Sequence, residues 1–221
     1  MLVQLKSSDN HQFSAYRCHN PGAKKGLVLL QEIFGVNQYI KEQCELFAQE
    51  GYDVIAPALF DRAQVQVELG YSAEDIQKGL ELRAQITQEQ ALLDIQSAIE
   101  ALGHQAVGVI GFCWGGTLSW LSACQLQGLS AASCWYGGGI AENKDLQANV
   151  PVQMHFGELD HSIPSDAIAA IRLSKPAVSI HVYPEADHGF GCSHRFQYQE
   201  LAYQEALRST LAFFQEHLRT V

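Results

Sequence analysis

The sequence has little positive charge. Its 221 residues include 14 Lys and Arg against 24 Asp and Glu, so the net charge is −10. Nucleic acids are bound by basic surfaces that neutralise their phosphates. The chain has no basic stripe of that kind, and we therefore exclude nucleic acid as its partner.

Long apolar segments are absent as well. No run approaches the roughly 20 apolar residues that a membrane-spanning helix needs, and residues 1–6 lack the pattern of a secretory signal peptide. The cysteines form no CxxC pair and no regular framework. They are Cys18, Cys44, Cys113, Cys124, Cys134 and Cys192. Free thiols in a reducing compartment explain them most simply, so we expect a cytoplasmic protein without a membrane partner.

What the chain does contain suits a globular α/β protein. Apolar residues make up 47% and charged residues 17%, which is ample material for one large core. No repeat, low-complexity tract or linker divides the sequence. We therefore expect one domain over residues 1–221, present as a monomer or a small homo-oligomer.

Strand-like and helix-like segments alternate along the chain. Strands are predicted over residues 13–18, 26–31, 53–56, 106–110, 130–136, 150–156 and 178–183, and helices over 37–50, 87–102, 117–127, 164–173 and 196–218. Asn37 can cap the first helix, and Thr87 with Gln90 can form a capping box for the second. Alternation at this spacing predicts βαβ units, and hence a mostly parallel sheet with helices on both faces.

The least regular segment covers residues 58–86. Its helical pattern is weak, and it contains Arg62, Arg83 and several carboxylates. It follows the carboxyl end of a predicted strand, and ligands of open α/β sheets bind at that end. The segment is therefore a candidate roof for a functional site.

The sequence Gly111-Phe112-Cys113-Trp114-Gly115 is the first chemical signal. It lies between an apolar strand and a helix, like the G-x-nucleophile-x-G turn of α/β-hydrolases, with cysteine in place of the usual serine. So sharp a turn strains the nucleophile's backbone and leaves no room for side chains two residues away on either side. The adjoining helix N-terminus would favour a thiolate at Cys113. A buried structural cysteine in a glycine-rich turn is the alternative.

Two further residues complete a predicted catalytic triad. Asp160 follows the strand at 150–156, and His188 follows the strand at 178–183. Nucleophile, acid and histidine in this order, each just after a strand, is the arrangement of α/β-hydrolases. We predict Cys113 as the nucleophile, His188 as the general base and acid, and Asp160 as the residue that orients the imidazole.

Other residues compete for two of these roles. The competitors are His155, His161 and His181 for the base, and Asp187 and Glu158 for the acid. His155 and His181 lie inside strands, which favours a place in the core or the sheet, and His161 has no triad position in this fold. Asp187 directly precedes the predicted base, and neighbouring residues rarely present their side chains to each other. Glu158 competes by composition alone.

Four segments together resemble the dienelactone hydrolase family. They are QEIFGVN at 31–37, GFCWGG at 111–116, GELD at 157–160 and HGF at 188–190. The similarity keeps the same order from about Gly26 to the C-terminus. It implies a single-domain α/β-hydrolase fold, a Cys-His-Asp triad, and hydrolysis of small esters or lactones without a cofactor.

The resemblance also implies roles for three residues near the nucleophile. In this family the glutamate at the position of Glu32 contacts the nucleophilic cysteine and takes its proton when substrate enters. The backbone amides of Ile33 and Trp114 are implied as the oxyanion hole. A turn or capping role near Asn37 is the alternative for Glu32, although an unpaired carboxylate at the end of a buried strand would be costly.

One position departs from the family pattern. Members that cleave dienelactones bind the substrate carboxylate with arginines, one of them four residues after the catalytic histidine, where this chain has Cys192. Arg62, Arg83 and Arg195 are the candidates to replace it. Because the expected arginine is missing, we predict weak discrimination in favour of anionic lactones.

The sequence thus predicts a cysteine-dependent hydrolase of small esters or lactones that works through a thioacyl-enzyme intermediate. Carboxymethylenebutenolidase-type activity falls within this class. No metal is expected, because Asp187, His188, Cys192 and His194 match no common zinc spacing. A non-catalytic ligand-binding or redox-sensing protein on the same fold is the alternative, although a sensor cysteine needs no Asp-His pair.

Overall fold

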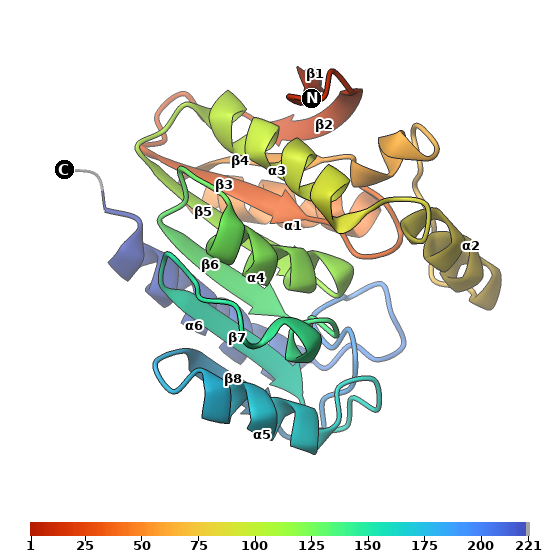
Figure 1. Cartoon of the computed structure of the whole chain (residues 1–221), viewed down its shortest axis with the longest axis vertical. Coiled ribbons are helices and arrows are strands. Elements are labelled where there is room, and N and C mark those ends of the chain that lie inside the picture. The colour runs from red at the N-terminus through yellow and green to blue at the C-terminus, as the bar shows by residue number, and fades with distance from the viewer. Residues whose placement is uncertain (220–221) are drawn as a thin grey trace.

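A computed structural model describes residues 1–219 and contains an eight-stranded sheet (Figure 1). The strands are β1 Leu2–Lys6, β2 Gln12–Cys18, β3 Lys25–Leu30, β4 Tyr52–Pro57, β5 Ala106–Phe112, β6 Ala131–Trp135, β7 Val152–Gly157 and β8 Ser179–Tyr183, in the spatial order β1-β2-β4-β3-β5-β6-β7-β8. The pairs β1–β2 and β2–β4 are antiparallel, and every pair from β4–β3 to β7–β8 is parallel. The predicted α/β-hydrolase sheet is confirmed.

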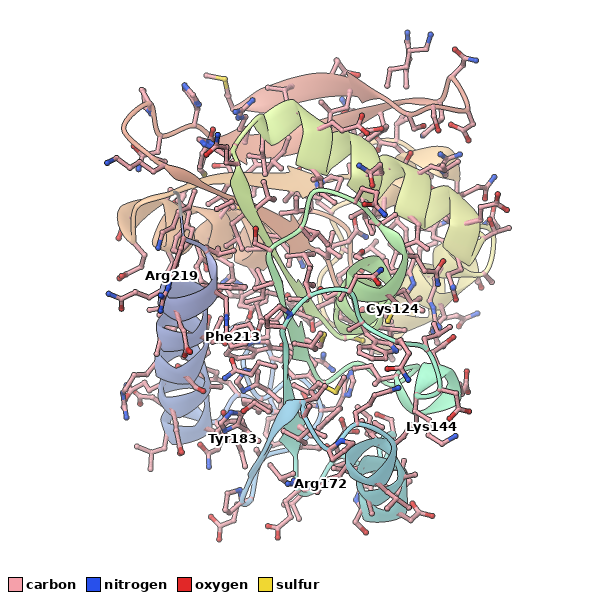
Figure 2. All side chains as sticks on the ribbon, turned by 60° about the vertical axis from the view of Figure 1, so that its left-hand side comes forward. Cys124, Lys144, Arg172, Tyr183, Phe213 and Arg219 are labelled. Carbon is pink, nitrogen blue, oxygen red and sulfur yellow. The ribbon has the colours of Figure 1, made fainter. Side chains whose placement is uncertain are left out.

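Helices cover both faces of this sheet. The helices are α1 Gln38–Gln49, α2 Ala73–Arg83, α3 Gln88–Leu102, α4 Trp114–Gln125, α5 Ser165–Ser174 and α6 Glu200–His217, with short 3-10 helices at Leu59–Arg62 (η1) and Ala141–Asn143 (η2). In Figure 1 α3, α4 and α5 lie in front of the sheet, and α1 and α6 lie behind it. Figure 2 turns the sheet nearly edge-on and shows side chains filling the space between these layers. No helix within residues 1–219 is long and apolar enough to cross a bilayer.

The helix ends follow the predicted capping residues. Asn37 Oδ1 accepts a hydrogen bond from the Ile40 amide at 3.3 Å at the start of α1. The capping box of α3 is confirmed, because Thr87 and Gln90 each bond to the other's backbone amide, at 3.2 and 3.0 Å. Gly103 ends the helix in the left-handed conformation, with φ of 66°.

The centre of the sheet is fully apolar. Every residue of the run 27–30 in β3 is 0% exposed, and β5 beside it is buried along its whole length. Continuous burial, instead of alternation, is the pattern of parallel strands covered on both faces. Each Leu or Val buried in this way contributes roughly 1.5–3 kcal/mol relative to an exposed position. The carboxyl ends of these central strands therefore form a rigid base for the loops that follow.

Outside the segment 58–86, the elements β1, α4 and α6 differ from the sequence prediction by more than two residues. The edge strand β1 is missing from it, because only alternate residues of this short strand are partly buried and the apolar pattern is weak. Helix α4 begins at Trp114, three residues early, since Gly115 and Gly116 look unhelical in sequence. The glycines are there because a Cβ at Gly116 would lie 2.2 Å from the Trp135 carbonyl oxygen. Helix α6 begins four residues later than predicted, after its N-cap Gln199.

Candidate active site

The turn between β5 and α4 holds Cys113 in a strained conformation. Its φ of 55° and ψ of −115° are unusual for a residue with a side chain. The flanking glycines make this turn possible: a Cβ at Gly111 would lie 2.1 Å from the Gly115 carbonyl oxygen, and one at Gly115 would lie 2.4 Å from the Leu30 carbonyl oxygen. Cys113 is a free thiol and is partly exposed. The geometry is that of a nucleophile elbow.

His188 and Asp160 meet at the same edge of the sheet. Nδ1 of His188 lies 2.7 Å from Oδ2 of Asp160, whose side chain is fully buried. The Asp160 carboxylate is fixed in turn by Ser162, whose amide and hydroxyl both donate to Oδ1. With Nδ1 committed to Asp160, Nε2 is the nitrogen of His188 that remains for the cavity and Cys113.

The charges at this site favour a protonated imidazole. Burial alone would lower the pKa of His188, but the Cys113 sulfur and the Asp160 carboxylate outweigh it and raise the pKa to about 10. Burial would raise the pKa of Asp160, yet the hydrogen bond and charge of His188 hold it below its usual 3.8. The arrangement therefore stabilises the imidazolium that forms when His188 accepts a proton.

The competing residues occupy other places. His155 is fully buried in β7, where it bonds to Tyr183 at 2.8 Å, and His181 belongs to β8. Asp187 accepts a hydrogen bond from the amide of His188, not from its ring. Glu158 is exposed and accepts from the amide of Glu185. Asp160 is thus the carboxylate that contacts the imidazole.

A cavity of about 460 Å³ opens beside Cys113. Its lining residues are Ile33, Phe34, Ile76, Leu80, Arg83, Cys113, Trp114, Thr117, Gly138, Gly139, Glu142, Ser162, His188 and Arg195. They come from the loop after β3, from α2, from the elbow, from the loop after β6 and from the loops after β7 and β8. The segment 58–86 does cover this site, because α2 supplies Ile76, Leu80 and Arg83 from one helical face.

The backbone amides of Ile33 and Trp114 lie near the nucleophile. Within residues 1–219, neither the amide of Ile33 nor that of Trp114 donates to a protein acceptor. Trp114 is the first residue of α4, where amides are left free by the helix itself. Both residues line the cavity, so both amides are available to a ligand oxygen.

Glu32 is paired with Arg195. Its side chain is 1% exposed, and Oε1 accepts a hydrogen bond from Arg195 Nη1 at 3.0 Å, while Oε2 accepts from the Tyr71 hydroxyl at 3.4 Å. Burial raises the pKa of Glu32, although the charge of Arg195 partly opposes the shift. Among the described residues Glu32 makes no hydrogen bond to Cys113, so the contact implied by the family resemblance is absent from this conformation.

The three candidate arginines have different places. Arg62 lies outside the cavity: it bonds to Asp94 and Asp9 at 2.8 Å and ties α3 to the turn after β1. Arg83 is exposed at the cavity wall. The guanidinium of Arg195 lies deeper, 5.7 Å from the centre of the Phe34 ring. The structure thus brings two of the three arginines to the site.

Sequence reasoning missed several residues of the site. Ser162 could have been found, since a serine two residues after a loop aspartate commonly donates back to its carboxylate. Tyr71 carries no such signal: it lies in the irregular segment and reaches Glu32 only through the tertiary fold. Cys192 is fully buried and donates to the Tyr71 hydroxyl at 3.2 Å. It therefore belongs to the surroundings of Glu32 instead of the cavity wall.

This sheet, its nucleophile elbow and the His-Asp pair at the strand ends define an α/β-hydrolase. A family model described as "Dienelactone hydrolase family" matches residues 13–218. The chain therefore belongs to the dienelactone hydrolase family. This finding confirms the hydrolase class predicted from the motifs.

Individual relatives agree with this placement. A protein of Synechocystis sp. that carries the provisional name carboxymethylenebutenolidase is 35% identical over 213 residues, covering 87% of this chain and 86% of its own length. A crystal structure with the provisional name dienelactone hydrolase, from Klebsiella pneumoniae, has a TM-score of 0.81 at 28% identity and covers 98% of this chain and 99% of its own. A dienelactone hydrolase-like promiscuous phosphotriesterase from metagenomic libraries has a TM-score of 0.77 at 20% identity, with 99% of each chain covered, and shares the fold alone.

Proposed function

We propose that this protein hydrolyses small carboxylic esters or lactones with Cys113 as its nucleophile, through a thioacyl-enzyme intermediate. The proposal rests on three features that meet at one cavity: the strained cysteine of the elbow, the His188–Asp160 pair, and two amides that donate to no acceptor among residues 1–219. Carboxymethylenebutenolidase-type activity is one member of this class.

The first half of the reaction is acylation. The sulfur of Cys113 bonds to the substrate carbonyl carbon while the thiol proton passes to Nε2 of His188. The amides of Ile33 and Trp114 donate to the oxygen that becomes negative, and each such donor is worth about 10²–10³-fold in rate. The carbon–oxygen bond to the leaving group then breaks, and the proton on His188 passes to the departing oxygen. The product is a thioester on Cys113.

The second half is hydrolysis of that thioester. A water molecule attacks the acyl carbon and gives a proton to His188, and the carbon–sulfur bond breaks. The thiolate that leaves regains the proton from His188, and the carboxylic acid is released. Asp160 keeps the imidazole in one tautomer and stabilises its charged form in both halves.

Glu32 has a proposed part in activating the thiol. In the resting protein its charge is matched by Arg195, so a proton acceptor is stored in a buried position close to the nucleophile loop. A substrate that loosens this pair would free the carboxylate to take the thiol proton first and pass it on to Nε2 of His188, which then delivers it to the leaving oxygen. The role keeps Cys113 unreactive until substrate arrives.

The cavity itself limits the substrate. Ile33, Phe34, Ile76, Leu80 and Trp114 give it a largely apolar wall. This lining suits a small aryl or alkyl ester or a lactone ring. Of the two arginines present, one is already paired with Glu32 and the other is exposed, which supports neutral substrates at least as well as anionic ones.

A panel of small esters and lactones tests the proposal. The wild type should release leaving group in a burst with an aryl ester, because acylation precedes deacylation. Cys113→Ala should lose turnover by several orders of magnitude while folding normally, since members of a triad act as a unit. A ligand-binding or redox-sensing protein would give no turnover with any member of the panel.

A further inference from the structure

Helix α2 packs against the backbone of the nucleophile's neighbouring loop at a single glycine. Gly79 is buried, and a Cβ placed on it would lie 2.0 Å from the carbonyl oxygen of Ile33. Gly79 has ordinary helical backbone angles, so its conformation does not require glycine. Glycine is required at this position because there is no space for a side chain.

The same loop is held by the rest of the segment that leads to α2. Gly35 has φ of 79°, and a Cβ on it would lie 2.0 Å from the carbonyl oxygen of Val67. The amide of Leu69 donates to the carbonyl of Phe34 at 2.9 Å. The backbone after β3 is therefore held at three successive residues. At Ile33 and Gly35 a glycine allows two backbone segments to approach closely, and at Phe34 a backbone hydrogen bond joins them.

We propose that Gly79 is a positioning residue for the oxyanion hole: its close contact with the Ile33 carbonyl fixes the direction of the Ile33 amide. The inference rests on the proposed acylation of Cys113. The carbonyl carbon and the amide nitrogen of Ile33 are both bonded to its Cα, so displacing the loop at this carbonyl displaces the Cα and the amide with it.

The helix that makes this contact also faces the substrate. Ile76, Leu80 and Arg83 line the cavity from one side of α2, while its buried residues, Gly79 and Leu82, hold the helix in place. One helix thus sets the wall of the cavity and the position of an amide that would stabilise the transition state. A change in how α2 sits should alter acylation more than it alters the thiol itself.

Gly79→Ala tests this relationship by adding one methyl group. Contacts under 3.0 Å force a shift, so the helix and the loop must separate by about 1 Å, and a misplacement of that size costs on the order of 10²-fold in rate. We expect the acylation burst with an aryl ester to slow by roughly ten- to a hundredfold. Alkylation of Cys113 by iodoacetamide forms no oxyanion, and its rate should stay within about threefold of wild type.

Two further variants make the result decisive. Gly22→Ala adds a methyl group in an exposed turn, where the nearest atom is 3.6 Å away, and should change neither rate. Leu82→Ala loosens the docking of α2 without adding an atom at Gly79, and it provides the test if Gly79→Ala fails to fold. It should slow acylation and leave alkylation unchanged.

The outcomes separate this inference from the proposed function. Acylation within threefold of wild type in a folded Gly79→Ala, or unchanged acylation in Leu82→Ala, overturns the positioning role. Equal losses of acylation and alkylation also overturn it, because they indicate general disruption of the site. A wild type that shows no acylation at all contradicts the proposed hydrolase instead.

Discussion

Arg195 and Glu32 form a nearly buried ion pair across 163 residues of sequence, with Nη1 and Oε1 3.0 Å apart. The side chains are 10% and 1% exposed. Gly189, next to His188, leaves room for the guanidinium, since a Cβ there would lie 2.5 Å from Nη1. The resting charge of Glu32 is therefore neutralised by an arginine that also lines the cavity.

Glu32→Gln should separate a catalytic role from a structural one. It preserves shape but leaves Arg195 without its counter-charge near Cys113, which favours the thiolate. We expect faster alkylation by iodoacetamide at neutral pH and a fall in kcat/KM of roughly 10²-fold, because the stored base is gone. Glu158→Gln, which changes an exposed carboxylate outside the cavity, is the control and should alter neither rate. Unchanged alkylation and turnover in a well-folded Glu32→Gln would contradict the activating role of Glu32 and indicate that Cys113, His188 and Asp160 act as a simple triad.

Substrate charge should matter little. Arg195 is occupied by Glu32, and Arg83 is exposed and screened by salt. In a matched pair of a neutral and a carboxylate-bearing lactone, we expect kcat/KM to differ by less than about tenfold. A charge-assisted contact to an arginine would favour the anion by roughly 1.5–3 kcal/mol, but Arg195 is already paired and Arg83 is screened. Arg83→Gln should remove what preference remains. A preference for the anion above about a hundredfold would show that substrate displaces Glu32 from Arg195.

The pH dependence of stability should reveal the His188 pair. The pKa of His188 is raised from 6.5 to about 10, so its protonated form stabilises the fold fully below pH 6.5, and this contribution is lost as pH rises through about 10. Urea unfolding should therefore find His188→Gln least stable relative to wild type below pH 6.5, with the difference shrinking as pH rises through about 10. His161→Gln, at an exposed position, is the control. A difference that stays constant with pH would argue against an imidazolium at this site.

Arg62 should be a structural residue. It bonds to Asp94, whose side chain is fully buried, and to Asp9. Arg62→Met would leave the buried Asp94 carboxylate unpaired, at a cost of about 3–5 kcal/mol in unfolding free energy. Activity per folded molecule should be unchanged, as measured by kcat/KM corrected for the folded fraction. A loss of kcat/KM without a loss of unfolding free energy would instead indicate that Arg62 contributes to the active site.

The sequence was most informative where backbone geometry restricts the residue type. Gly111 and Gly115 could be assigned to the elbow because no side chain fits there, and the capping pair Thr87–Gln90 marks a helix start by its spacing alone. The positions of Cys113, Asp160 and His188 just after three strands of the parallel sheet predict that they meet, because parallel strands end at one edge. These signals are local or follow from topology.

Side-chain pairing between distant loops could not be predicted in this way. The pairing of Arg195 with Glu32, and that of Arg62 with Asp94, depend on where irregular segments pack, and an arginine in sequence carries no sign of its partner. Helix α2 is also hard to predict from the sequence, for a different reason. Only Gly79 and Leu82 are buried, so the helix has almost no apolar stripe facing the core.

The central claim is that Cys113 carries the acyl group during turnover. The most direct test is to quench the wild-type enzyme during turnover of a slow aryl ester and to map the adduct by peptide mass spectrometry. The account predicts one acyl group, bound to the peptide that contains Cys113, and no adduct in Cys113→Ala. An acyl group on any of the other five cysteines, with hydrolysis retained in Cys113→Ala, would contradict it.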